Sequence, residues 1–191
     1  RMNRIALSAC FRCIAIAWLA TASVAMAAPA PAWSLLPLPA KASLAASGAT
    51  EIGDGATVSV RGEDRQQVLS IAQRFVQRVA DTNGLHLNMA TKDGAHPAIT
   101  FDVNPRADMS DDASYRITMD EGGIVITART PRGVFYGSVT LWQLLTPPGW
   151  TRGAPVKVAY GVIDDQPRFT WRALLLDSGR HFQRVAQIKQ L

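Results

Sequence analysis

Cysteine is almost absent from this sequence, and its position excludes several kinds of chemistry. The 191 residues contain two cysteines, Cys10 and Cys13. Both fall in an amino-terminal segment with the features of an export leader, so the mature chain that we expect has none. Disulfide bonds, thiol nucleophiles and cysteine-ligated metals are therefore excluded for that mature chain.

Histidine is also scarce, and the common cofactor motifs are missing. His86, His96 and His181 have no short spacing to one another or to acidic residues, which disfavours a metal site. The sequence has no glycine-rich phosphate loop, no G-x-S-x-G elbow and no interleaving of basic and aromatic residues. We expect no cofactor, no metal and no nucleic-acid partner.

The first 27 residues predict a cleaved signal peptide. Arg1 and Arg4 give a positive start, Ile5 to Val24 is apolar apart from Arg12, and small residues at 25 and 27 fit a signal-peptidase site. The alternative is a membrane anchor, but the apolar stretch after Arg12 is shorter than the roughly 20 residues that span a bilayer. We expect export to the periplasm or the medium, with no stable membrane association after cleavage.

Two further properties of this leader bear on partners. The segment Leu7–Cys10 resembles a lipoprotein cleavage box, but it follows Arg4 too closely for a membrane-inserting region, which disfavours lipidation. Removing residues 1–27 lowers Lys+Arg from 20 to 17 against 15 Asp+Glu, so the net charge falls from +5 to +2. The remaining basic residues form no cluster that would favour a polyanionic partner.

The mature sequence alternates between strand and helix patterns after a Pro- and Ala-rich lead-in (28–39). Strand alternation is found at 56–62, 98–103, 114–119, 123–129 and 156–163. Helical spacing covers 63–83, ending at Asn83-Gly84, and Thr130-Pro131 resembles an N-cap and first helical residue for a helix to about Leu145. This order predicts an α+β fold, with a mostly antiparallel sheet and helices on one face, over residues 28–165.

A second unit begins after the turn at Asp164–Pro167. The apolar run "RALLLD" (172–177) has the pattern of a buried strand, and Gln183 to Leu191 begins a helical pattern. Residues 166–191 therefore read as the first strand and the start of the first helix of a truncated β/α barrel.

Asp177, Arg180 and His181 bring ionisable groups to the end of this predicted strand. In α/β barrels the carboxyl end of a strand faces the ligand, and an arginine there can form bidentate hydrogen bonds to ligand oxygens. The alternative is that Asp177 and Arg180 form a local ion pair that caps the loop. The neighbouring carboxylates Asp164 and Asp165 are the weaker candidate, because consecutive residues of an extended chain point to opposite sides.

Two motifs resemble a known family. "TPRGVFYGSVTLWQLL" (130–145) and "DQPRFTWRALLLDSGRHF" (165–182) are similar to the junction between the small domain and the catalytic barrel of glycoside hydrolase family 20, the β-N-acetylhexosaminidases. The resemblance is sharp from Thr130 onward and weaker from Trp33 to Arg129. Ala173 stands where the family commonly has Gly, and Gly179 where it has Ala or Ser.

The resemblance implies a site and a mechanism. It implies that Arg180 binds hydroxyl groups of a terminal N-acetylhexosamine in an oligosaccharide of chitin or glycan origin, and that Asp177 supports Arg180. It also implies substrate-assisted retaining hydrolysis, in which the 2-acetamido oxygen of the sugar attacks the anomeric carbon beside an Asp–Glu pair, without a metal. That pair is expected beyond Leu191, so no catalytic residue is assigned here, and the 191-residue chain alone is predicted to be inactive.

Two other readings stay open at this point. One is a non-catalytic carbohydrate-binding or scaffold module of an exported protein, which would end naturally after the α+β domain. The other is a different glycosidase family with a similar small domain before its barrel.

Overall fold

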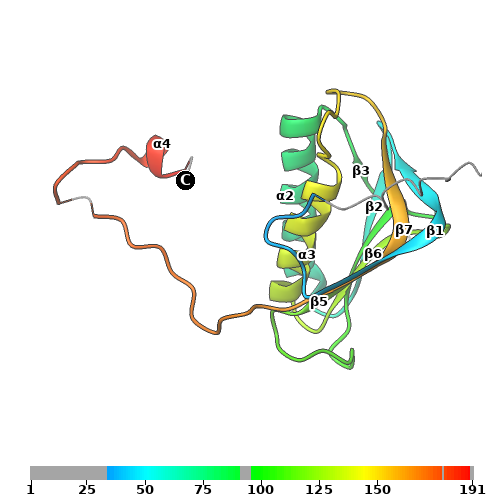
Figure 1. Ribbon diagram of the computed structural model, residues 1–191, viewed down its shortest axis with the longest axis horizontal. Helices are drawn as coiled ribbons and strands as arrows, with labels where there is room; N and C mark the ends of the chain where they lie inside the picture. The colour runs from blue at the N-terminus through cyan, green and yellow to red at the C-terminus, as the bar shows by residue number, and fades with distance from the viewer. Residues whose placement is uncertain (1–33, 91–95, 178, 190–191) are drawn as a thin grey trace, which may run out of the picture. The chain divides into compact units, whose positions relative to one another are not determined.

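The computed structural model describes residues 34–90, 96–177 and 179–189. Residues 34–165 form one seven-stranded sheet with two long helices on one of its faces (Figure 1). The expected signal peptide, residues 1–27, lies outside the described residues. No helix among the described residues is long and apolar enough to cross a membrane.

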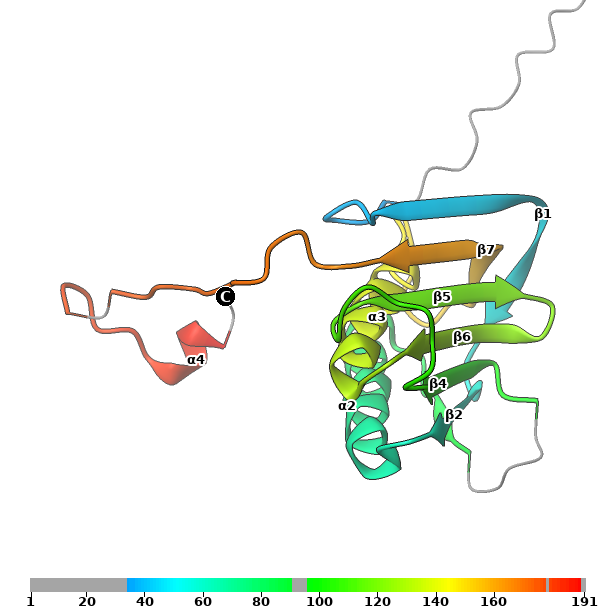
Figure 2. The ribbon, with the colours of Figure 1, turned by 90° about the horizontal axis from the view of Figure 1, so that it is seen from below.

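The strands lie in the order β1-β7-β5-β6-β4-β2-β3, and Figure 2 shows this order from β1 to β2. They are β1 (Lys41–Ile52), β2 (Thr57–Gly62), β3 (Asn88–Met89), β4 (Ile99–Val103), β5 (Tyr115–Asp120), β6 (Gly123–Ala128) and β7 (Val156–Asp165). The helices are α2 (Arg65–Asn83), α3 (Pro131–Leu144) and the short α4 (Val185–Ile188).

The sheet is mixed, which corrects the expectation of a mostly antiparallel sheet. The pairs β1–β7, β7–β5 and β5–β6 are antiparallel, whereas β6–β4, β4–β2 and β2–β3 are parallel. The parallel half arises because α2 carries the chain back across the sheet, so that β4 runs in the same direction as β2. After β4 the chain enters β5, and the hairpin from β5 returns β6 beside β4. The α+β class itself is confirmed.

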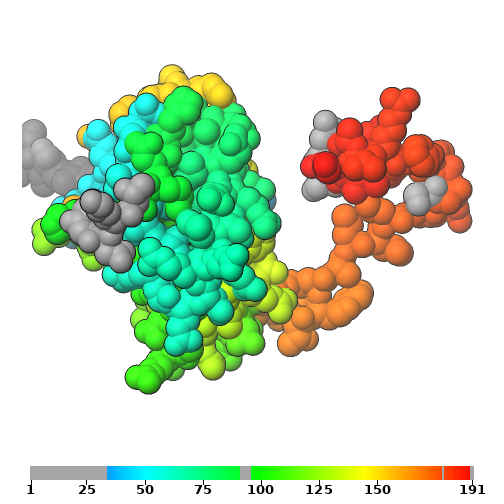
Figure 3. Space-filling model, turned by 180° about the vertical axis from the view of Figure 1, so that it is seen from behind, coloured from blue at the N-terminus to red at the C-terminus, as the bar shows by residue number. Residues whose placement is uncertain are grey.

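Helix α2 is held by one apolar face. Val68, Ala72, Phe75 and Val79 are buried at the spacing of successive helical turns, as the periodicity predicts. The opposite face is polar and exposed (teal in Figure 3), with Gln73, Arg74, Gln77 and Arg78 on it. Gly84, with φ 74°, ends the helix in the left-handed conformation that glycine adopts without strain.

Helix α3 begins at the predicted cap. The Thr130 hydroxyl accepts a hydrogen bond from the Gly133 N–H at 3.5 Å and donates one to the Asp112 carbonyl at 2.5 Å. Pro131 occupies the first turn, where its missing N–H costs no helical hydrogen bond. Arg78 of α2 lies over the Trp142 ring of α3, 5.3 Å from its centroid, and joins the two helices.

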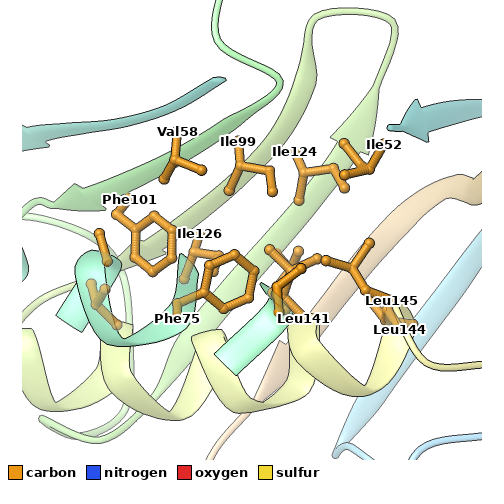
Figure 4. Close-up of a cluster of buried hydrophobic side chains, with 14 of the residues drawn as sticks. Ile52, Val58, Phe75, Ile99, Phe101, Ile124, Ile126, Leu141, Leu144 and Leu145 are labelled. Carbon is orange, nitrogen blue, oxygen red and sulfur yellow. The ribbon is translucent and has the colours of Figure 1, made fainter. Parts of the chain in front are cut away.

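The core lies between the helices and the sheet (Figure 4). Phe75 of α2 packs edge-to-face on Phe101 of β4, with ring centroids 5.4 Å apart. Around them are fully buried side chains of the strands, of α3 and of the residue that caps α3: Ile52, Val58, Ile99, Ile124, Ile126, Leu141 and Leu145. Burial of the strand side chains toward the helices explains the alternation seen in the sequence.

The tail after β7 differs from the expected barrel strand. Residues 171–177 pair with no other strand within the described chain, and Leu174 and Leu175 are 71% and 93% exposed. A strand needs a neighbour for its backbone hydrogen bonds, and residues 34–165 offer the tail none. The expected strand is therefore not confirmed, whereas a helix does follow, in the short form of α4.

Candidate functional site

Asp177 and Arg180, the two predicted site residues, contact each other. The Arg180 Nε atom lies 3.7 Å from Asp177 Oδ2, and the two side chains are 87% and 63% exposed. Asp177 Oδ1 also accepts a hydrogen bond from the Gly179 N–H at 3.0 Å, which closes the loop after the apolar run. The structure thus holds the local ion pair that the sequence left open, and it leaves the Arg180 guanidinium accessible to a ligand.

Asp164 and Asp165 have separate partners at the end of β7. Asp164 Oδ1 pairs with Arg116 Nε of β5 at 2.5 Å, and this hydrogen bond raises the pKa of Arg116. Asp165 instead accepts hydrogen bonds from the Tyr115 hydroxyl at 2.8 Å and the Ala40 N–H at 2.9 Å. The two carboxylates therefore bind different protein partners, and both fix the structure where the chain leaves the sheet.

Two depressions meet at this exit point. A polar cleft of about 280 Å³ is lined by residues that include Ser110, Tyr115, Arg116, Asp164 and Asp165. A more apolar groove of about 470 Å³ lies between residues 35–39 and α3, and residues 165–169 and 172 line its remaining side. Tyr115, Asp165 and Gln166 belong to both. Most polar side chains of this cleft bond to one another, because Ser110 also bonds to Gln166 and Ser114.

In the described part of the chain, His86 is paired with Asp54, and no cluster of side chains could hold a metal ion. His86 donates its backbone N–H to Asp54 Oδ1 at 2.6 Å, which lowers the pKa of that carboxyl, and its ring lies 3.2 Å from the same oxygen. This pair closes a surface turn. Nowhere in the described ranges do three His, Cys, Asp or Glu side chains come close enough together to hold a metal ion.

The groove is the feature that sequence reasoning missed. Its walls come from four separate segments, within residues 35–39, 113–115, 136–143 and 165–172, and no local pattern joins them. Tyr136 and Gln143 of α3 were visible only as part of the "TPRGVFYGSVTLWQLL" motif. The one available signal was the presence of polar and aromatic residues on the outer face of an otherwise apolar helix.

Comparison with protein families gives a match over most of the chain. A family model described as "Glycosyl hydrolase family 20, domain 2" matches residues 32–166. Among curated proteins, a beta-hexosaminidase of Porphyromonas gingivalis is 26% identical over 99% of this chain and 25% of its own length. A beta-hexosaminidase of Vibrio furnissii is 35% identical over 49% of this chain and 14% of its own length.

Similar solved structures are also hexosaminidases. The N-acetyl-beta-hexosaminidase of Streptomyces plicatus, solved in complex with Thio-NAglucal, is 28% identical with a TM-score of 0.71, over 85% of this chain and 32% of that one. The exo beta-N-acetylglucosaminidase of Vibrio harveyi, in complex with N-acetylglucosamine, is 25% identical with a TM-score of 0.68, over 82% and 22% of the two chains. The present chain spans about a quarter of the length of the Porphyromonas relative.

Proposed function

Because the chain belongs to glycosyl hydrolase family 20, we propose that it is the amino-terminal part of an exo-acting β-N-acetylhexosaminidase. The whole protein would remove terminal N-acetylglucosamine or N-acetylgalactosamine from oligosaccharides derived from chitin or glycans. The observation that carries this proposal is the family match over residues 32–166, supported by relatives named beta-hexosaminidases. As the chain covers a minor share of those relatives, the activity is proposed for the full-length protein.

Arg180 is the residue of this chain that would touch the sugar. Its guanidinium is exposed and its neighbour Asp177 holds it from one side, which leaves N–H groups free to donate to sugar hydroxyls. The proposed mechanism uses the substrate's own 2-acetamido oxygen as nucleophile, and the Asp–Glu pair that supports it would lie outside this chain. The residues described here would bind and orient the sugar.

Export is proposed from the sequence alone. A leader of residues 1–27 would direct the protein to the periplasm or the medium, where chitin and glycan fragments are accessible, and cleavage would leave Ala28 as the first residue.

The full-length protein tests the activity directly. We expect it to release 4-nitrophenol from 4-nitrophenyl N-acetyl-β-D-glucosaminide or its galactosaminide counterpart. The matched glucoside, which lacks the 2-acetamido group, should not react, because substrate assistance requires that group. Equal hydrolysis of the glucoside, or no hydrolysis of either N-acetylated substrate, would overturn the proposal.

Arg180 is tested in the same assay. We expect Arg180→Ala to lower kcat/KM by roughly tenfold to a hundredfold, the loss of one or two charge-assisted hydrogen bonds. Lys189→Ala, which removes an exposed cation nine residues further along, serves as the matched control and should leave kcat/KM unchanged.

A further inference from the structure

The chain that leads to Arg180 is anchored to the α+β domain at two arginines. Arg168 Nη2 donates to the Leu38 carbonyl at 3.2 Å. Arg172 places its guanidinium carbon 4.9 Å from the centre of the Tyr136 ring of α3. Between them, Phe169 lines the apolar groove. The anchoring therefore uses one hydrogen bond and one cation–π contact within five residues, while Phe169 itself stays 72% exposed.

The surfaces that receive these arginines are themselves fixed. Residues 34–40, which we call the strap, are tied to α3 by Gln143, whose side chain accepts from the Leu36 N–H at 2.8 Å and donates to the Leu36 carbonyl at 3.0 Å. The other end of the strap is tied to β7 through the Ala40 N–H and Asp165. Leu35 is buried in the core. The strap carbonyl that holds Arg168 therefore moves with the sheet and α3.

Within the described residues, Arg172 is the last residue of the tail that contacts the sheet or the long helices. Among the described residues, no hydrogen bond, ion pair or ring contact joins residues 173–189 to the sheet or to the long helices. Arg180 lies eight positions after Arg172, and an extended chain of that length reaches about 26 Å. The point and direction at which the chain leaves Tyr136 therefore limit where Arg180 can lie.

We infer that Arg172, stacked on Tyr136, is a positioning residue that sets the location of Arg180 in the sugar site. This inference rests on the proposed function. A planar guanidinium that keeps its charge at every relevant pH suits the task, since it can stack on a ring face while its edge stays hydrated. Arg172 touches no substrate itself and acts through the chain that it holds.

Kinetics of the full-length enzyme distinguish positioning from simple stabilisation. We expect Arg172→Ala to raise KM about threefold to tenfold, which lies within the range that a cation–π contact spans from exposed to desolvated settings, with kcat within about twofold. Arg172→Lys should recover part of the loss. A purely structural role would instead reduce the folded fraction, which lowers kcat and leaves KM unchanged.

The partner ring gives matched variants. Tyr136→Leu should reproduce the rise in KM, and Tyr136→Phe, which keeps the ring, should restore KM to within about twofold of the original. Arg172→Ala combined with Tyr136→Leu should be no worse than either change alone, because both remove the same contact. Arg172→Ala should also cause no further rise in KM when it is added to Arg180→Ala.

The control is Arg132→Ala. Arg132 is an exposed arginine on α3 whose side chain has no partner in the described structure, so this change should leave KM unchanged.

Hydrogen exchange tests the inference without using activity. We expect the amides of residues 173–180 in the full-length protein to exchange faster in Arg172→Ala, whereas those of α2 and β4 keep their protection. If exchange of 173–180 is unchanged, or if KM does not rise in an active enzyme, the inference is wrong. An original protein that hydrolyses no N-acetylated substrate contradicts the proposed function instead, and the exchange experiment still decides the role of Arg172.

Discussion

Tyr115 joins the three parts of the domain that meet where the chain leaves the sheet. Its backbone belongs to β5, its hydroxyl bonds to Thr140 of α3 at 2.6 Å, and it donates to Asp165 of β7 at 2.8 Å. Burial raises the pKa of the Tyr115 phenol well above its ordinary value of 10.0; the Thr140 hydrogen bond opposes this shift, and the Asp165 carboxylate adds to it. The phenol therefore remains protonated in the folded state at a pH where an unfolded tyrosine ionises.

This shift predicts a specific loss of stability in alkali. Below pH 10 the phenol is protonated in both the folded and the unfolded state, and its contribution to the free energy of unfolding is complete. Above pH 10, ionisation of the phenol in the unfolded chain lowers that free energy by up to about 1.4 kcal/mol per pH unit. Urea unfolding of a polypeptide of residues 28–172 between pH 9 and 11.5 measures this loss. The quantity to compare is the decline in the free energy of unfolding with pH in the unchanged polypeptide and in Tyr115→Phe.

A matched change separates the two causes of this shift. Asp165→Asn should retain most of the alkaline decline, since burial is the largest cause of the shift. An identical decline in Tyr115→Phe would mean that other groups produce it.

Helix α3 owes its close approach to the sheet to two glycines one turn apart. A Cβ atom on Gly133 would lie 2.3 Å from the Ser114 carbonyl oxygen, and one on Gly137 would lie 2.5 Å from Cγ2 of Ile126. Both distances are below any van der Waals contact, so the helix must move outward to admit a methyl group. The outer face of the same helix carries Tyr136 and Gln143, which hold the tail and the strap.

We expect Gly137→Ala to destabilise the domain by about 1 to 3 kcal/mol, because overpacking outweighs the gain of up to about 1 kcal/mol that alanine brings to a helix. The midpoint of urea unfolding of residues 28–172 measures this. Gln73→Ala, on the exposed face of α2, should change stability by less than about 0.5 kcal/mol. A more stable Gly137→Ala protein would contradict the close packing.

The elements that could be predicted are those whose residues carry their own pattern. β4, β5, β6 and both long helices match the predicted positions within two residues, because alternation, Thr130-Pro131 and Asn83-Gly84 are local signals. β1 was missed because it is an edge strand rich in alanine and serine and mostly exposed, and it is held by backbone pairing to β7. The parallel pairs were missed because register between distant segments leaves no trace in either one.

The candidate site divides in the same way. Asp177 and Arg180 were found because they lie within one motif, and their ion pair spans three residues. The Arg172–Tyr136 contact and the Arg168–Leu38 hydrogen bond join residues 36 and 130 positions apart in sequence, and the groove is lined by four separate segments, so that only the folded chain brings them together.

At the scale of the whole molecule, the α+β domain has partners for its buried polar groups, whereas the tail after β7 leaves apolar side chains and backbone groups without partners in the described chain. Within the described residues no buried side-chain nitrogen or oxygen lacks a hydrogen-bond partner. The tail instead exposes large apolar side chains, namely Phe169, Trp171, Leu174, Leu175 and Phe182. Its extended backbone at 171–177 has unpaired N–H and C=O groups beside these side chains, which is the pattern of an aggregation-prone edge.

We therefore predict that a polypeptide of residues 28–191 self-associates and hydrolyses no N-acetylglucosaminide. Light scattering at increasing concentration should show association of 28–191 at concentrations where 28–172 remains monomeric. Leu175→Lys should suppress association without changing the melting temperature, since Leu175 is 93% exposed and a charge interrupts the apolar run. Thr170→Lys adds the same charge outside that run and should suppress it less.

The predicted inactivity and the predicted association of residues 28–191 have separate causes, and different results would contradict them. Inactivity follows if the catalytic Asp–Glu pair lies outside this chain, so release of 4-nitrophenol by purified 28–191 would show that catalytic carboxylates lie within it. Association follows from the unpaired apolar run, so a monomeric 28–191 would show that the tail satisfies its own backbone. A soluble Leu175→Lys chain that remains inactive separates the two, because it removes association as the reason for the missing activity.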